Sequence, residues 1–320
     1  MAETLYIVVP CYNEQEVLNE TTGRLTDKLQ KMMDRGLIDS ESRIMYVDDG
    51  SKDRTWPIIC GLYEKNAMVT GIKLSRNKGH QNALLAGLFE AAEHADMIVS
   101  MDADLQDDIE VLDKFVDDYY KGSQIVYGVR KSRKKDSVFK KTTAIMFYKM
   151  MKAMGVELVY NHADYRLMSK RAVKELMNYK EVNLFLRGII PLIGFKSSVV
   201  EYDRGSRFAG KSKYPLRKMI YFAIDGLTST SVRPIRIITM FGFLTVLFSI
   251  IYALYVVVGH VAGGTVPGWT TSVLLICFFG GAQIMCIGIV GEYVGKIYLE
   301  TKERPRYVIE TKLECRQKNI

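Results

Sequence analysis

The sequence lacks the GxGxxG loop with which many enzymes bind dinucleotides. The phosphate-loop pattern GxxxxGK[S/T] fits only residues 205–212, outside the predicted run of alternating strands and helices, so it does not indicate a backbone cradle for phosphate. The five cysteines show no metal-binding spacing, and neither His94 nor His260 has a partner at ligand spacing. We therefore expect no zinc site, and we expect reduced thiols in a cytosolic setting.

Two long stretches near the C-terminus also lack charge. Residues 237–259 and 270–291 contain no Asp, Glu, Lys or Arg. At about 1.5 Å per residue, each stretch is long enough to cross a hydrocarbon core of roughly 30 Å as a helix. We predict two transmembrane helices, at about 235–259 and 270–293. The alternative, a pair of buried helices in a soluble domain, is disfavoured by the length of these runs.

Basic residues lie on only one side of these two stretches. Arg233 and Arg236 precede the first, several Lys and Arg follow the second, and the turn between them carries neither. Because Lys and Arg collect on the cytoplasmic side of spanning segments, we expect a multi-pass protein of the inner (plasma) membrane with its large domain and both termini in the cytoplasm. The N-terminus lacks a basic flank, so no cleavable signal is expected.

The overall charge and hydropathy fit this division. A mean hydropathy of +0.00 averages a polar part and an apolar part. The net charge of +8 and the pI near 9.0 suit anionic lipids or phosphorylated substrates more simply than nucleic acid, which we do not expect as a partner.

In the polar part, short apolar runs alternate with helical patterns. Strands are predicted over 5–9, 44–47, 69–74, 97–101 and 124–129, and helices over 14–35, 55–66, 79–93 and 108–121. This order predicts an α/β fold with a doubly wound, mostly parallel sheet, in which ligands bind beyond the carboxyl ends of the strands. Asn13, with Glu16 three positions on, is expected to cap the first helix. His80 is interpreted as a polar cap at the start of a later helix, with a substrate contact as the alternative.

Polar loops follow three of the predicted strands. They read PCYNE at 10–14, DDGS at 48–51 and DADLQD at 102–107. Since the carboxyl ends of parallel strands share one edge of a sheet, the three loops are expected to converge on one crevice. The closely spaced carboxylates of Asp102 and Asp104 are the hard oxygen ligands that Mg²⁺ or Mn²⁺ prefers. An acidic pair in this place is alternatively a helix cap or a solvated turn.

These motifs, in this order and spacing, resemble family-2 glycosyltransferases with a GT-A fold. HADYRLMSK at 162–170 and RFAGKSKY at 207–214 narrow the resemblance to polyisoprenyl-phosphate glycosyltransferases, similar to bactoprenol glucosyltransferases and dolichyl-phosphate mannose synthases. The resemblance implies a cytoplasmic GT-A catalytic domain over 1–213 and a juxtamembrane amphipathic segment over 214–233. Two transmembrane helices within 234–298 and a cytoplasmic tail over 299–320 complete the chain. A further interfacial helix is expected over 138–154, with packing on the sheet as the alternative.

The resemblance also implies a role for each motif residue. The nucleotide pocket would be lined by Pro10, Tyr12, Glu14, Asp48, Asp49 and Asp102. Mg²⁺ or Mn²⁺ would be held by Asp104 and Gln106, and the acceptor phosphate by Arg207, Lys211, Ser212 and Lys213. The catalytic residues would be Asp164, at the position of the catalytic base, with Asp102 and Arg166. Lys211 stands where relatives often carry an acidic residue.

Structural alternatives stay open for several of these residues. Tyr12 is alternatively an aromatic packed at a strand end, Asp48 and Asp49 are alternatively turn caps, and Arg166 alternatively only pairs with Asp164. A phosphate monoester has its second pKa near 6 and is ionised at neutral pH, so its attack hardly needs a general base. We therefore expect Asp164 to orient Arg166 or the sugar.

The implied reaction is inverting transfer of a single sugar to polyisoprenyl (undecaprenyl) phosphate on the cytoplasmic leaflet. UDP-glucose is the expected donor, with UDP-N-acetylglucosamine and GDP-mannose as alternatives. The expected assembly is a homo-oligomer, for which a tetramer is one arrangement. Processive polysaccharide synthesis is disfavoured because no QxxRW motif occurs. Outside the enzymes, the alternative is a non-catalytic membrane scaffold.

Overall fold

The computed structural model describes residues 2–131, 162–182, 185–203, 205, 233–261 and 268–314. Within these residues one sheet has the strand order β7-β5-β6-β4-β1-β2-β3-β8. The strands are β1 (Leu5–Cys11), β2 (Arg43–Asp48), β3 (Val69–Leu74), β4 (Met97–Ser100), β5 (Ile125–Arg130), β6 (His162–Ser169), β7 (Ser197–Tyr202) and β8 (Ile309–Leu313). Four neighbouring pairs are parallel, whereas β4/β6, β5/β6 and β3/β8 are antiparallel. The predicted mostly parallel α/β sheet is confirmed.

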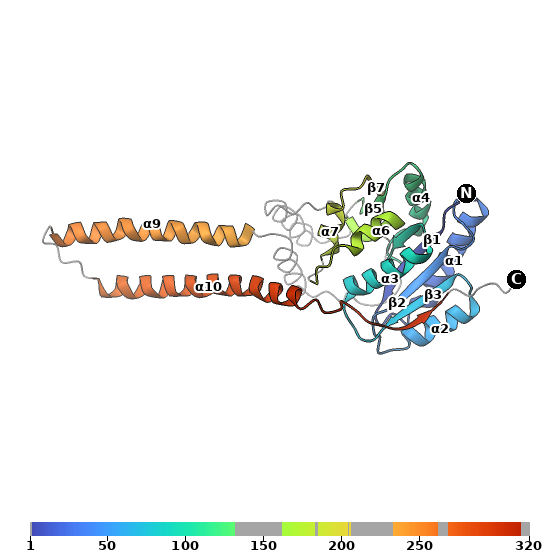
Figure 1. Ribbon diagram of the computed structural model, residues 1–320, viewed down its shortest axis with the longest axis horizontal. Coiled ribbons are helices and arrows are strands. Elements are labelled where there is room, and N and C mark those ends of the chain that lie inside the picture. The colour runs from blue at the N-terminus through green and yellow to red at the C-terminus, as the bar shows by residue number, and fades with distance from the viewer. Residues whose placement is uncertain are drawn as a thin grey trace.

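The helices cover both faces of this sheet (Figure 1). The helices of this domain are α1 (Leu18–Asp34), α2 (Thr55–Lys65), α3 (His80–His94), the short 3₁₀ helix η1 (Ile109–Val111), α4 (Leu112–Tyr120), α6 (Lys170–Met177) and α7 (Leu186–Leu192). Two long helices, α9 (Arg233–Val261) and α10 (Trp269–Thr301), follow in the chain and do not cover the sheet (Figure 1). Every residue of β1 and β2 is buried, as expected for central parallel strands covered on two sides. Leu5, Ile7 and Val9 pack in the core on one face, and Tyr6 and Val8 in the core on the other.

Helix α3 packs unusually closely on the centre of the sheet, at Gly87. A Cβ built there would lie 2.4 Å from Val8 Cγ1 and 2.6 Å from Val47 Cγ2. Both neighbours are buried, β-branched side chains in central strands, so they have little room to move. The glycine therefore sets the distance between α3 and the strands that carry the functional loops.

We expect Gly87→Ala to destabilise the protein by about 1–3 kcal/mol, the usual cost of overpacking a core. The measurement is the apparent Tm of the detergent-solubilised protein. Gly23→Ala, in α1 with nothing within 4 Å of its added Cβ, is the control, and it should leave the Tm unchanged or raise it slightly. An equal effect of the two substitutions would contradict this account of Gly87.

The predicted cap of the first helix is wrong. The helix begins at Leu18 with Val17 at its N-cap and no side-chain cap, and Asn13 adopts a left-handed φ of 54°. Asn13 instead accepts a hydrogen bond from the Lys52 backbone N–H at 2.9 Å and donates its own N–H to Ser51 Oγ at 3.0 Å. The Asn13 side chain and backbone N–H that a local capping pair would use are therefore bonded to the loop after β2.

Helices α9 and α10 lie side by side and extend away from the sheet (Figure 1). Among the described residues, 233–252 and 278–301 form two segments long and apolar enough to cross a membrane, with mean hydropathies of 2.0 and 1.3. Almost none of either segment is buried by the protein, 0% and 6% respectively. After α10 the chain returns to the sheet, where β8 covers the edge of β3. The proposed domain limits stay a prediction.

Candidate active site

The loops after β1, β2 and β4 lie at the carboxyl ends of adjacent strands. β1 pairs in parallel with both β2 and β4, so the loops that follow these three strands leave the sheet at the same edge. β6 runs the opposite way, and its register places Arg166 opposite Ser100 at the end of β4. The beginning of β6 therefore carries Asp164 to the edge at which the loop with Asp102 starts.

Asp164 lies at the centre of a charged cluster. Its Oδ1 accepts a hydrogen bond from Arg166 Nη2 at 2.6 Å and from Arg187 Nε at 3.2 Å, while Oδ2 accepts from Arg187 Nη2 at 3.1 Å. His80 Nε2 lies 3.6 Å from Asp164 Oδ2 and 3.9 Å from Asp102 Oδ1. Residues from α3, β6 and α7 thus converge on the Asp164 carboxylate, and His80 also faces Asp102 in the loop after β4.

The cluster fixes the charge state of Asp164. Burial alone would raise the pKa of Asp164, but Arg187, the contact with His80, and Arg166 oppose it and hold the pKa well below its usual value. Arg166 is only 1% exposed, and its Nη1 is buried without a hydrogen-bond partner among the residues described. Asp164 therefore accepts hydrogen bonds from two arginines, and these contacts favour its ionised form.

Sequence reasoning missed Arg187 and misread His80. Arg187 lies in the apolar helix α7 and belongs to no motif, so only its tertiary contact with Asp164 marks it. The N-cap of α3 is Gly79, and no side chain caps the helix. His80 faces the carboxylates instead, and the interpretation of His80 as a polar cap is wrong. Although burial lowers the pKa of His80, the hydrogen bond to Asp164 and the charge of Asp102 raise it overall.

Asp48 and Asp49 have different surroundings. Asp48 is fully buried; its Oδ1 accepts the Ser51 N–H at 3.2 Å, and its Oδ2 has no hydrogen-bond partner within the described part of the chain. Burial raises the pKa of Asp48. Asp49 accepts the backbone N–H groups of Lys78 at 2.7 Å and Gly79 at 2.9 Å. These two hydrogen bonds hold the turn before α3, and the contact of Asp48 or Asp49 with a nucleotide stays a prediction.

The PCYNE loop begins inside the sheet. β1 continues to Cys11, so Pro10 is a buried strand residue paired with Val47. Tyr12 and Glu14 are half-buried, and the Glu14 backbone N–H donates to Thr55 Oγ1 at 2.9 Å. These contacts tie the loop to the segment after β2 and leave both side chains at the edge where the strand-end loops meet. Their contact with a nucleotide stays a prediction.

The acidic loop after β4, residues 102–107, is held by a hydrogen bond within the loop and by contacts with β5 and β7. Asp104 accepts the Gln106 backbone N–H at 3.2 Å, and the intervening Leu105 has a left-handed φ of 56°. Asp107 is buried, accepts a hydrogen bond from Tyr202 at 2.5 Å, and lies 3.8 Å from Arg130 Nη2. These contacts fix the loop against the end of β7, with the Asp104 carboxylate partly exposed.

The donor set of this loop fits a divalent cation that arrives with its substrate. Burial raises the pKa of Asp102, and the like charges of Asp164 and Asp104 add to this effect, while His80 opposes it. A cation would relieve that repulsion. Among the described residues, no three His, Cys, Asp or Glu side chains form a metal cage. Mg²⁺ typically binds one or two carboxylates together with substrate phosphates and water. Asp104 and its neighbours can supply the carboxylates.

The predicted acceptor-phosphate residues Arg207, Lys211, Ser212 and Lys213 lie outside the described residues, as do 138–154 and the predicted juxtamembrane segment up to 232. Gly205, just before them in sequence, donates its backbone N–H to the carbonyl of Gln106 at 2.9 Å. The chain that leads to the predicted acceptor loop therefore contacts the acidic loop directly.

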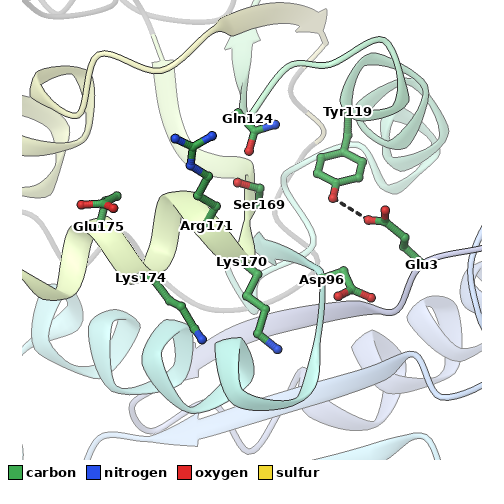
Figure 2. Close-up of a pocket in the computed structure, with 9 residues that line it drawn as sticks. All are labelled: Glu3, Asp96, Tyr119, Gln124, Ser169, Lys170, Arg171, Lys174 and Glu175. Atoms are coloured by element: carbon green, nitrogen blue, oxygen red, sulfur yellow. Dashed lines mark hydrogen bonds between the residues drawn. The ribbon is translucent and has the colours of Figure 1, made fainter.

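A cavity of about 430 Å³ lies at the opposite edge of the sheet (Figure 2). It is lined by residues that precede strands, including Glu3, Asp96 and Gln124, and by Lys170 and Lys174 of α6. Tyr119 donates a hydrogen bond to Glu3 at 2.5 Å across one side. Because ligands of doubly wound sheets bind beyond the carboxyl ends of the strands, this cavity is at the wrong edge for the predicted chemistry.

Comparison with known proteins defines the class. Residues 6–177 match Glycosyl transferase family 2, and residues 233–297 match the GtrB C-terminal hairpin. The chain belongs to glycosyltransferase family 2, and the family resemblance read from the motifs is confirmed. The long apolar helices α9 and α10 coincide with this hairpin. They indicate that the glycosyltransferase is associated with a membrane.

Individual relatives cover almost the full length. The uncharacterized glycosyltransferase YkoT of Bacillus subtilis (strain 168) is 52% identical over 309 residues, which are 97% of this chain and 92% of that protein. The bactoprenol glucosyl transferase of Shigella phage SfX is 36% identical over 310 residues, 96% of this chain and 98% of that protein. The solved structure of mannosyltransferase PcManGT from Pyrobaculum calidifontis, in complex with GDP-Man and Mn²⁺, has a TM-score of 0.43 and 15% identity, over 92% of this chain and 88% of that one. That likeness is too distant to support an inference.

Proposed function

We propose that this glycosyltransferase moves a single sugar from a nucleotide donor to a polyisoprenyl phosphate, with undecaprenyl phosphate as the acceptor. The observation that carries the proposal is the Asp164 cluster, in which Arg166 and Arg187 converge beside Asp102 in a chain that also bears an apolar hairpin. Relatives named bactoprenol glucosyl transferase, at 35–36% identity over nearly the whole chain, support the same acceptor class and transfer of glucose. For the donor we propose UDP-glucose. UDP-N-acetylglucosamine and GDP-mannose are the next candidates.

The donor would lie over the carboxyl ends of β1, β2 and β4. Asp48 has a buried carboxylate oxygen without a protein partner among the described residues, and a base or ribose donor group would satisfy it. Asp102 would contact the sugar-nucleotide. Asp104, with Gln106, would hold Mg²⁺ or Mn²⁺, and such an ion supplies Lewis-acid stabilisation of a departing diphosphate.

The protein's own residues would orient the attack. The acceptor is a phosphate monoester, which is largely ionised at neutral pH and is itself the nucleophile. Two phosphorylated reactants repel each other, and the guanidinium groups of Arg166 and Arg187 offset that repulsion. Asp164 fixes these groups in place. Arg207, Lys211 and Lys213 would add positive charge at the acceptor. A single in-line displacement inverts the anomeric carbon.

The hairpin would bring this site to the lipid. The basic flanks at Arg233 and Arg236 support a multi-pass protein of the plasma membrane whose N-terminal domain and both termini would lie in the cytoplasm. A homo-oligomer, with a tetramer as one arrangement, remains part of the proposal.

The experiment is to incubate the purified protein with Mg²⁺ or Mn²⁺, undecaprenyl phosphate and each labelled sugar nucleotide, and to extract the lipid. The proposal predicts labelled lipid that carries one sugar, with UDP-glucose as the best donor. A non-catalytic scaffold would give no labelled lipid with any donor, and a processive synthase would give lipid-linked chains.

Replacing Asp164 by asparagine tests whether this residue orients or removes a proton. Because the pKa of Asp164 is well below its usual value, the wild-type carboxylate stays ionised from mildly acidic to alkaline pH. Asp164→Asn should lower the rate by about tenfold, the loss expected for a hydrogen bond to a charged group, with the same factor at every pH. Recovery of the Asp164→Asn rate as the pH rises would identify a missing general base and contradict the orienting role.

A further inference from the structure

The C-terminal end of α10 contacts the catalytic domain through polar groups. Both carboxylate oxygens of Glu300 accept the backbone N–H of Val182, at 3.0 and 2.8 Å. A few residues beyond the helix, Arg306 donates a hydrogen bond to the carbonyl of Tyr179. Both contacts fall on the connection between α6 and α7. We call residues 179–182 and 185–187, which run from this connection into the first turn of α7, the strap.

The other end of the strap reaches the reaction centre. The Leu186 backbone N–H donates to Gln81 Oε1 at 2.8 Å, and Phe185 is buried at 2% exposure. The next residue, Arg187, donates to both carboxylate oxygens of Asp164. Gln81 directly follows His80, whose Nε2 is 3.6 Å from Asp164 Oδ2. The strap and the start of α3 therefore meet at the same carboxylate.

The position of Glu300 is not explained by the stability of its own helix. α10 ends at Thr301, so Glu300 lies in the last turn, where a negative charge opposes the helix dipole. Its carboxylate is compensated by a backbone N–H group of the strap, and hydrogen bonds to an ionised group are stronger than those between neutral groups. The contact thus favours a role between the two parts of the chain.

We propose that Glu300 is a positioning residue that sets the place of Arg187 on Asp164 through the strap, and so links the seating of the membrane hairpin to the reaction centre. This inference rests on the proposed function. Only a short piece of chain joins Val182 to Arg187, and a displacement of about 1 Å in a catalytic constellation costs up to about 10²-fold in rate. A helix held by the bilayer would thereby fix the arginine that orients the reactants.

The kinetic test uses the full-length protein in lipid nanodiscs and the variants Glu300→Ala and Glu300→Gln. Glu300→Ala should lower kcat by about tenfold while the donor KM changes less than about twofold, because the donor-side residues Asp48 and Asp102 belong to β2 and to the loop after β4 rather than to the strap. Glu300→Gln keeps one acceptor oxygen and should recover part of the loss. The exposed Glu303 is the matched control, and Glu303→Ala should leave kcat unchanged.

A double substitution separates positioning from a general structural role. If Glu300 acts through Arg187, adding Glu300→Ala to Arg187→Ala should lower the residual rate by less than about twofold, since coupled residues are not additive. Fully multiplicative losses would overturn the proposal, as would a Glu300→Ala variant with wild-type kcat.

Hydrogen exchange of the same full-length protein tests the strap without turnover. Glu300→Ala should speed amide exchange at Val182 and also at Leu186, whereas Glu303→Ala should not. Unchanged exchange at these amides would overturn the inference even if the enzyme is active. If the wild-type protein transfers no sugar to lipid phosphate, the proposed function fails, and the exchange result still decides whether Glu300 holds the strap.

Discussion

Replacing Asp104 by alanine is expected to reduce sugar transfer by about 10³-fold and to abolish the response of the residual rate to Mg²⁺ or Mn²⁺. The acidic loop is fixed against the end of β7 through Asp107 and Tyr202, so the loop should keep its shape when the Asp104 side chain is lost. The expected loss corresponds to about 4 kcal/mol, in the range of what a bound cation contributes to stabilising a developing charge. The measurement is the initial rate of lipid labelling against metal concentration.

Asp117→Ala is the control for this substitution, because Asp117 is an exposed carboxylate on the neighbouring helix α4. It should behave as wild type. A rate and metal response of Asp104→Ala that match those of Asp117→Ala would remove Asp104 from the site and leave the acidic loop with only a structural role.

The second large effect is expected at Arg187. Arg187→Ala should lower kcat by about 10²-fold, comparable to the loss of one positioned donor in an active site, because Asp164 would lose its two-pronged partner. Arg187→Lys keeps the charge but not the planar fork and should recover only part of the rate. Thermal unfolding should change little in comparison, since Arg166 still pairs with Asp164.

Arg35→Ala provides the matched control for Arg187. Arg35 is 50% exposed and pairs with Asp113 on the surface at the end of α1, where such pairs contribute little. Its removal should affect neither rate nor stability. If Arg187→Ala also retained full activity, the Asp164 cluster would be a structural ion-pair network and would carry no catalytic role.

Much of the sheet could be predicted from the sequence, because its strands are continuous apolar runs bounded by polar loops. The predicted strand over 69–74 coincides with β3, and the other four differ from the observed strands only at their ends. The same pattern placed Asp48, Asp102 and Asp104 at strand ends. Local information failed at Asn13, where the loop after β2 took over the backbone groups that a capping pair would bind.

What the sequence could not show are contacts between residues distant in the chain. Strand β8 follows the membrane hairpin and pairs with the edge strand β3. No local sequence pattern indicates that the chain returns to the sheet at this point. Arg187 lies in an apolar helix, and only its contact with Asp164 marks it as a site residue. That contact forms because the antiparallel strand β6 brings Asp164 next to α7. His80 is the first residue of α3, but its position in the sequence could not show that it faces Asp102 and Asp164, which come from the loop after β4 and from β6.

The anomeric configuration of the lipid product tests the central claim most directly. Wild-type protein, given an α-linked UDP-glucose donor, undecaprenyl phosphate and Mn²⁺, should yield one glucose per lipid in the β configuration, because the lipid phosphate attacks the anomeric carbon in a single displacement. NMR of the extracted product reads this configuration. A product with retained configuration, or nucleotide release without any glycosylated lipid, would contradict the account.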